Sequence, residues 1–164
     1  MLRVIKVQHE DFELADHYDD LRAQSGEALG GIASFIGLVR DHNQVAGDGG
    51  TVATLRLEHY PGMTESSIES IIGDAEERWP LLGVTVVHRV GELQPTEQIV
   101  LVLVASAHRA AAFAAAEFLM DYLKTRAVFW KKEVSDRGER WIESTSVDQG
   151  RARAWNAEEQ AAKD

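Results

Sequence analysis

Alternating apolar and polar residues mark most of the strands that the sequence predicts. Arg3 to Gln8 alternates over a short stretch, and Thr51 to Tyr60 alternates more cleanly. Gly30 to Arg40 is rich in residues that favour strands and is expected to be mostly buried. Further strands are predicted at residues 84–90, 98–105 and 139–143. The first two of these flank a Gln-Pro-Thr turn, so we expect them to form a hairpin.

Helical spacing of apolar residues predicts three helices. The first runs to about Gln24, with Asp11 as its N-cap. The second begins near Pro61, because proline is tolerated in a first helical turn, and ends at Pro80. The third is alanine-rich and runs from His108 to about residue 126.

This order of elements predicts an α+β domain with a mixed sheet and flanking helices. Strands and helices do not alternate strictly, and no glycine-rich nucleotide-binding motif follows a strand. We expect residues 1–150 to form this single domain and residues 151–164 to form a polar C-terminal tail with helical propensity. Residues 41–50, with three glycines, are the best candidate for a mobile loop.

Composition narrows the classes of function. The chain of 164 residues fits one domain and has no cysteine, so any sulfur chemistry needs sulfur supplied by another molecule. The net charge of −10 disfavours nucleic acid and anionic membrane surfaces as partners. The longest apolar run, Ile99 to Ala105, is far short of the roughly 20 residues that span a bilayer. These features predict a cytoplasmic protein.

One stretch of the chain carries a net positive charge, although the chain as a whole is acidic. Residues 105–133 hold five Lys or Arg against three Asp or Glu, a net +2, so the remainder of the chain carries −12. His108 and Arg109 open the third predicted helix, whose free N–H groups and dipole favour a phosphate or carboxylate. Arg40, at the end of a strand, is a weaker candidate. For the basic stretch, the alternative to an anion site is a solvated helix face. For His108 and Arg109, the alternative is structural capping of the helix.

Two lysines are candidates for catalysis. Lys124 and Lys131 are seven residues apart and share one face if the helix continues. Apolar neighbours would lower the pKa of such a lysine, whereas the alternative is a lysine that covers apolar surface and keeps its charge in water. The six histidines show no metal-ligand spacing, and we expect no metal and no cofactor.

Several longer motifs resemble one family, the large, catalytic subunit of molybdopterin synthase. They are Leu57–Met63, Ser106–Arg109, Met120–Arg126 and Phe129–Glu133, with support from Phe35–Asn43 and His88–Leu93. The resemblance covers roughly residues 3–150, in order and with compatible spacing. Val128 departs from the pattern, since many relatives have proline there, and this suggests a longer helix. Ser144–Ser146 lacks an arginine that some relatives have, so Arg140 or Arg151 could replace it.

The resemblance implies an α/β-hammerhead fold and a homodimer within a heterotetramer. A small ubiquitin-like carrier subunit would bring sulfur as a C-terminal Gly-Gly thiocarboxylate, and two sulfurs would pass to cyclic pyranopterin monophosphate to form the molybdopterin dithiolene. By motif, Lys124 and Lys131 match the active-site lysines. Lys124 is expected nearest the reacting carbons, as proton-transfer group or transient nucleophile, with Lys131 in electrostatic support. The expected substrate-binding residues are Leu38, Val39, Arg40, His108, Arg109, Lys132 and Glu133.

Helix geometry adds an inference of its own. Lys124 follows His108 by sixteen residues, which is roughly 24 Å along a continuous helix. A pterin monophosphate cannot bridge that span within one chain, so we expect a site shared by two protomers. The alternative function is a docking module that binds the carrier without catalysis. Such a module need not retain both lysines together with Arg40, His108 and Arg109.

Overall fold

The computed structural model describes residues 1–40 and 52–163, so the loop predicted at 41–50 lies outside the described residues. The strands are β1 (Leu2–Gln8), β2 (Gly31–Leu38), β3 (Val52–His59), β4 (Leu81–Arg89), β5 (Gly91–Leu93), β6 (Gln98–Ser106), β7 (Phe129–Ser135) and β8 (Gly138–Ile142). The helices are α1 (Leu14–Gln24), α2 (Met63–Arg78), α3 (Arg109–Thr125) and α4 (Ser146–Lys163).

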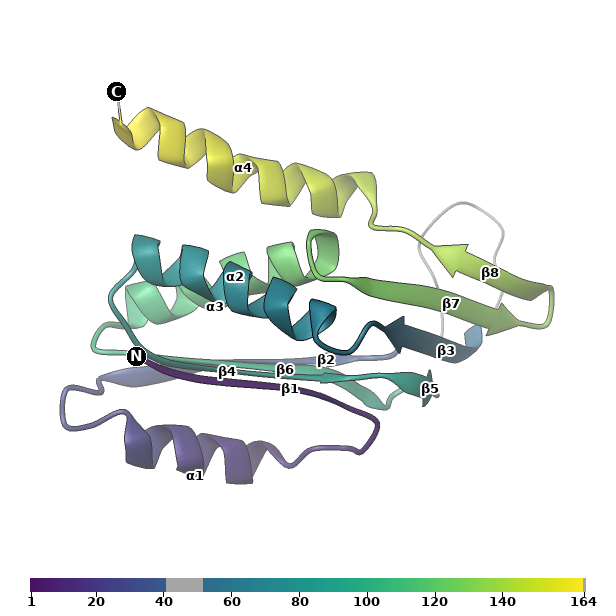
Figure 1. Ribbon diagram of the computed structural model, residues 1–164, viewed down its shortest axis with the longest axis horizontal. Coiled ribbons are helices and arrows are strands. Elements are labelled where there is room, and N and C mark those ends of the chain that lie inside the picture. The colour runs from purple at the N-terminus through teal and green to yellow at the C-terminus, as the bar shows by residue number, and fades with distance from the viewer. Residues whose placement is uncertain (41–51, 164) are drawn as a thin grey trace.

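The strands form two four-stranded sheets. The larger has the order β1-β4-β6-β2, in which β1 and β4 are parallel and the other pairs are antiparallel. The smaller, antiparallel sheet has the order β5-β3-β7-β8 and extends from one end of the larger one (Figure 1). The predicted α+β class with a mixed sheet is confirmed.

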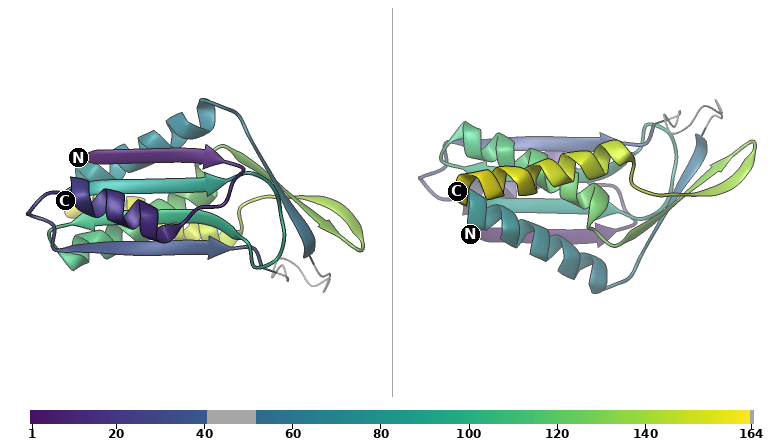
Figure 2. Two further views of the ribbon diagram at one scale, coloured as in Figure 1. Left: turned by 90° about the horizontal axis from the view of Figure 1, so that it is seen from below. Right: turned by 90° about the horizontal axis from the view of Figure 1, so that it is seen from above.

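Helices cover both faces of the larger sheet. Helix α1 lies on one face, α2 and α3 lie on the other, and α4 lies over α2 and α3 as an outer layer (Figures 1 and 2). Side chains such as Ile71, Val86 and Leu119 are fully buried between the sheet and the α2–α3 layer, and each contributes about 1.5–3 kcal/mol by leaving water. A separate small apolar cluster of Val39, Leu57, Val90 and Leu93 lies where the two sheets meet.

Two helix starts differ from the sequence prediction. The N-cap of α1 is Glu13, because the Asp11 carboxylate instead accepts hydrogen bonds from Phe12 N (2.9 Å) and from the side-chain amide of Gln98 (2.8 Å). Helix α2 begins at Met63, so Pro61 precedes the helix. Its cap is Gly62, whose N–H donates to the Glu65 carboxylate at 2.7 Å. Pro80 follows the end of α2 as predicted.

The sequence patterns predicted only part of the smaller sheet. Strands β4 and β6 do pair antiparallel, as the predicted hairpin requires, but β5 between them pairs with β3 of the other sheet. Strand β7 was missed altogether, because Phe129–Ser135 follows an alanine-rich helix that looked able to continue.

The polar tail expected from residue 151 onward is part of α4, which already begins at Ser146 and packs on α3. The Tyr122 hydroxyl donates to Asn156 Oδ1 at 2.8 Å, and the Trp155 indole N–H donates to Asp121 Oδ2 at 2.8 Å. Within the described part of the chain, no helix is both long and apolar enough to cross a membrane.

Candidate functional site

A sharp turn between α3 and β7 brings the two candidate lysines together. Helix α3 ends at Thr125, so the continuous helix that would place Lys124 and Lys131 on one face does not form. The backbone of Val128 explains the turn: its N–H bonds to Ser67 Oγ (3.3 Å), and its carbonyl accepts from Thr64 Oγ1 (2.7 Å). Both partners lie on α2, which therefore holds the chain where α3 gives way to a strand.

Lys131 is the lysine whose charge the protein disfavours. Its partly buried side chain belongs to β7, and burial lowers the pKa of its ammonium group. The positive charge of Lys124 lowers that pKa further, whereas Asp148 raises it. A larger fraction of Lys131 is therefore neutral at a given pH than for a lysine in water.

Lys124 has a wetter environment than the apolar one considered from the sequence. Its side chain is 46% exposed, and its Nζ lies 3.4 Å from Asp148 Oδ1 at the start of α4. Phe113, an apolar residue earlier on the same helix, is itself exposed. Desolvation therefore acts on Lys131, and Lys124 has an acidic partner.

A hollow of about 670 Å³ lies beside Lys131, at the end of the smaller sheet. Tyr60 and Trp130 meet edge to face in its wall, with ring centroids 4.4 Å apart. The remaining lining residues are Glu58, His59, Trp141, Ile142 and Glu143. The wall thus combines aromatic surface with one lysine and two carboxylates.

The segment 38–40 is held by the turn between β5 and β6. Val39 N donates to Glu97 O at 2.9 Å, and Thr96 N donates to Val39 O at 2.8 Å. Thr96 has φ of 75°, a strained conformation for a β-branched residue, which directs its N–H to that carbonyl. Val39 is buried, whereas Leu38 and Arg40 on either side of it are exposed.

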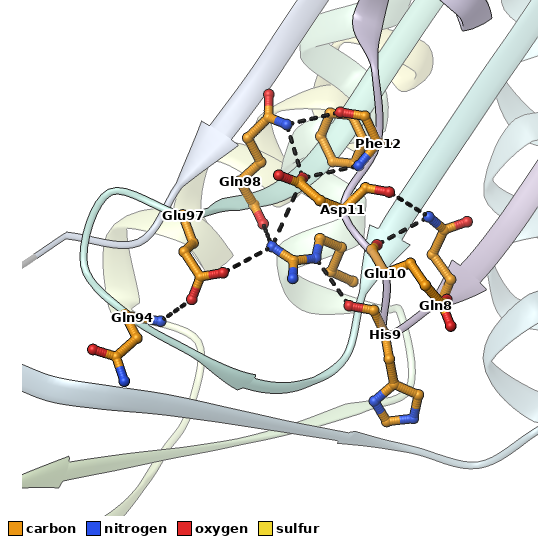
Figure 3. A network of polar contacts seen from close by, with 9 residues as sticks. Gln8, His9, Glu10, Asp11, Phe12, Gln94, Glu97 and Gln98 are labelled. Carbon is orange, nitrogen blue, oxygen red and sulfur yellow. Dashed lines mark hydrogen bonds and ion pairs between the residues drawn. The ribbon is translucent and has the colours of Figure 1, made fainter.

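A buried arginine anchors this turn (Figure 3). Arg89, 7% exposed, donates to the carbonyls of His9 (3.1 Å) and Gln98 (3.0 Å) and to the Glu97 carboxylate (3.4 Å). The second carboxylate oxygen of Glu97 accepts from Gln94 N at 2.6 Å. One side chain therefore connects the loop after β1, the end of β4 and the turn that holds Val39.

His108 and Arg109 lie at the opposite end of α3 from Lys124. Both are exposed; His108 is the N-cap, and its side chain makes no capping hydrogen bond. Gly30 packs so closely that a Cβ there would lie 2.0 Å from Ala107 O, just before them. The helix between them and Lys124 is unbroken, so one chain does not bring His108 and Arg109 together with Lys124 and Lys131.

The comparisons with known proteins identify the family. The family model described as MoaE protein matches residues 7–126. The chain belongs to the MoaE family. It is similar to the molybdopterin synthase catalytic subunits of Vibrio cholerae (53% identity over 92% of this chain and 97% of that protein) and Yersinia pestis (52%, 92% and 96%). It is also similar to the solved structure of the molybdopterin biosynthesis MoaE protein from Burkholderia ambifaria, with 44% identity, a TM-score of 0.79 and coverage of 94% and 99%.

Two further residues taken from the MoaE resemblance lie on β7 but bind within the β7–β8 hairpin. Lys132 follows Lys131 directly and so points to the other face of the strand. Its ammonium group pairs with Glu139 and lies 5.4 Å from the Trp141 ring centroid. Glu133 lies 3.7 Å from the Arg140 guanidinium.

Arg140 and Arg151 were the two residues considered as replacements for an arginine that some relatives have. Arg151 binds α3. Arg151 Nε donates to Asp121 Oδ1 at 2.9 Å, and a second nitrogen of its guanidinium pairs with Glu117. Both carboxylates belong to the third helix rather than to the hollow. Arg151 therefore fixes α4 in place and does not supply a free cation for phosphate.

Sequence reasoning missed Asp148 and the residues of the hollow on β3 and β8. Glu58, His59 and Tyr60 were part of a recognised MoaE motif but received no role. For Asp148 the signal was the Thr145-x-x-Asp spacing, which is typical of a helix start. Among residues 1–40 and 52–163, no three His, Cys, Asp or Glu side chains are grouped to hold a metal ion.

Proposed function

We propose that the chain is the catalytic subunit of a cytoplasmic molybdopterin synthase. It transfers two sulfur atoms from the C-terminal thiocarboxylate of a small ubiquitin-like carrier subunit to cyclic pyranopterin monophosphate. The observation that carries this proposal is Lys131 in the wall of the hollow, with its pKa lowered by burial and by the charge of Lys124, in a chain of the MoaE family. The relatives are named catalytic subunits, which supports a second, different subunit as partner.

The two lysines suit different parts of the reaction. Sulfur transfer develops negative charge on the oxygen of the thiocarboxylate carbonyl, and a fixed cation stabilises that charge. Lys124, paired with Asp148, supplies the cation next to the reacting carbons. Lys131 is more often neutral than an ordinary lysine, because its pKa is lowered, and its free amine is therefore available to take up a proton during the reaction. This assigns to Lys131 the proton transfer that the sequence had favoured for Lys124.

The phosphate contacts require a second protomer. Arg40 lies at the end of β2, whereas His108 and Arg109 lie at the far end of α3 from Lys124. The unbroken α3 supports a site in which one protomer supplies the lysines and its partner supplies His108 and Arg109. The assembly is then a homodimer of this chain with one carrier at each end.

Reconstitution tests the activity. Purified protein is mixed with thiocarboxylated carrier and cyclic pyranopterin monophosphate, and the product is measured as its oxidised fluorescent pterin. We expect product from the wild type and from Lys6→Ala, an exposed lysine on β1, and at least about a hundredfold less from Lys124→Ala. A wild type that binds the carrier but yields no product would leave the docking module as the function.

A mixed dimer tests the shared site. One chain carries Lys124→Ala and the other carries Arg109→Ala, so a shared arrangement leaves one of the two sites intact. We expect about half of the wild-type rate from the mixed dimer, and a far lower rate from either mutant homodimer. A mixed dimer as inactive as the two homodimers would place all of these residues in one chain's site.

A further inference from the structure

The start of α4 brings a carboxylate to the lysine pair. The groups that face Lys131 electrostatically are Lys124 from α3 and Asp148 from α4. The nearby imidazole of His88 on β4 is held neutral by burial. Asp148 is therefore the acidic group that acts on both lysines, and it lies in the first turn of a helix that continues into the tail expected at residues 151–164.

The two oxygens of the Asp148 carboxylate have different tasks. Oδ2 accepts from Thr145 Oγ1 at 2.8 Å and from Thr145 N at 3.2 Å, while Asp148 N donates back to Thr145 Oγ1 at 3.1 Å. This reciprocal capping box fixes the carboxylate at the first turn of α4. Oδ1 is left facing Lys124 Nζ at 3.4 Å.

The helix that carries Asp148 is itself fixed on α3. Arg151 and Trp155 both bind the Asp121 carboxylate, and Tyr122 donates to Ala152 O (3.2 Å) as well as to Asn156. Asp121 and Tyr122 lie within one helical turn of Lys124. The distance between Asp148 and Lys124 is therefore set by contacts on the same two helices.

We propose that Asp148 is a positioning residue of the synthase site, which holds the Lys124 ammonium group in place and offsets the repulsion between the two lysines. The expected effect of Asp148 on turnover rests on the proposed function, whereas its expected effect on the pKa of Lys131 does not. Burial raises the pKa of Asp148, yet its hydrogen bonds with Thr145 and the charge of Lys124 outweigh burial and lower it overall. Asp148 thus stays a carboxylate throughout the neutral range.

The test compares Asp148→Asn with Asp74→Asn. Asparagine keeps the shape and a cap acceptor but removes the charge. Asp74 is the matched control, because it pairs with Arg126 (2.6 Å) at the same end of α3 but away from the lysine pair. The readout on the free protein is the pH dependence of trace acylation of Lys131, followed by mass spectrometry. We expect the pKa of Lys131 to fall in Asp148→Asn and to stay unchanged in Asp74→Asn.

The second readout is turnover in the reconstituted synthase. We expect the kcat of Asp148→Asn to fall about tenfold or more, because a displaced cation stabilises the transition state less well. Its KM for the pterin should change less than about threefold, since the phosphate contacts lie elsewhere. An unchanged Lys131 titration together with wild-type kcat would overturn the proposal.

Asp148→Glu separates charge from helix capping, and serves where Asp148→Asn is too unstable to assay. It keeps the negative charge but moves it by one methylene group. We expect the pKa of Lys131 to stay near its wild-type value while kcat falls. An equal fall of that pKa in Asp148→Glu and Asp148→Asn would show a structural effect and overturn the proposal.

If the wild type itself makes no product, the proposed function fails, while the titration still decides the role of Asp148.

Discussion

The imidazole of His88 lies against the ring of Phe129, with centroids 3.9 Å apart and planes 24° from parallel. His88 belongs to β4 of the larger sheet, and Phe129 begins β7 of the smaller one. This stacked pair therefore joins the two sheets two residues before Lys131. The Nδ1–H of His88 donates to Arg89 O at 2.8 Å, which fixes the position of the ring, and burial keeps the ring neutral.

Acid should weaken the fold through His88. Burial lowers its pKa to about 3, so below pH 6.5 the unfolded chain takes up a proton that the folded chain refuses. Stability is then lost as the pH falls from about 6.5 towards 3, by up to about 1.4 kcal/mol per pH unit. We expect His88→Phe to flatten this slope in urea unfolding measured between pH 4.5 and 7.5. The exposed His9→Asn should keep it, and an equal slope in all three proteins would contradict the assignment.

Removing one lysine should change the titration of the other. Lys124→Met deletes a positive charge that lowers the pKa of Lys131, so that pKa should rise. Trace acylation of Lys131 across pH measures the shift without any substrate. Arg126→Met, which removes a cation two residues further along, is the control and should leave the Lys131 titration in place. A Lys131 titration insensitive to Lys124 would mean that the two groups are not coupled.

The turn between α3 and β7 should depend on one hydroxyl of α2. Thr64→Val keeps the shape of a fully buried side chain but leaves the Val128 carbonyl without its partner. We expect a loss of about 1–3 kcal/mol in the free energy of unfolding, and a lower kcat because Lys131 shifts relative to Lys124. Ser70→Ala, on the exposed face of the same helix, should change neither quantity noticeably. Wild-type stability of Thr64→Val would rule out this role for the hydroxyl.

Two glycines should respond in opposite ways to alanine. At Gly30 a Cβ would lie 2.0 Å from Ala107 O, so the backbone that leads into His108 must move. We expect Gly30→Ala to lose at least about 2 kcal/mol of stability and to weaken pterin binding. At Gly73, inside α2, nothing lies within 4 Å of the added methyl group. Gly73→Ala should therefore gain about 0.5–1 kcal/mol, as measured by thermal unfolding.

Local patterns in the sequence located the strands of the larger sheet, since β1, β4 and β6 carry clear alternation or apolar runs. Strand β7 escaped because Phe129–Ser135 contains adjacent charges and follows a helix that propensity alone would continue. What ends that helix is tertiary: two side chains of α2 bind the backbone of Val128. No signal within residues 120–135 encodes those contacts.

The candidate site likewise has residues that sequence motifs identify and features that only tertiary packing determines. Lys124, Lys131, His108 and Arg109 were selected from their motifs and neighbours along the chain. Which lysine is desolvated was not predictable, because it depends on β3 and β8 packing around Lys131. Asp148 was missed because its partner Lys124 lies 24 residues away, and the packing of α4 on α3 sets that distance. Sequence spacing finds groups on one element, but charge balance across three elements needs the fold.

Among the residues that the structure describes, the small apolar cluster where the sheets meet has four buried members, Val39, Leu57, Val90 and Leu93, whereas the α2–α3 layer rests on a far larger core. Lys131 is paired across β3 with Leu57 of the small cluster, whereas Lys124 follows Leu123 of the large core on α3. Local opening of β7 and β8 therefore requires much less free energy than global unfolding. On heating, the lysine pair should separate first, so that enzymatic inactivation precedes the melting of the helices and amide exchange is fastest in the β7–β8 hairpin.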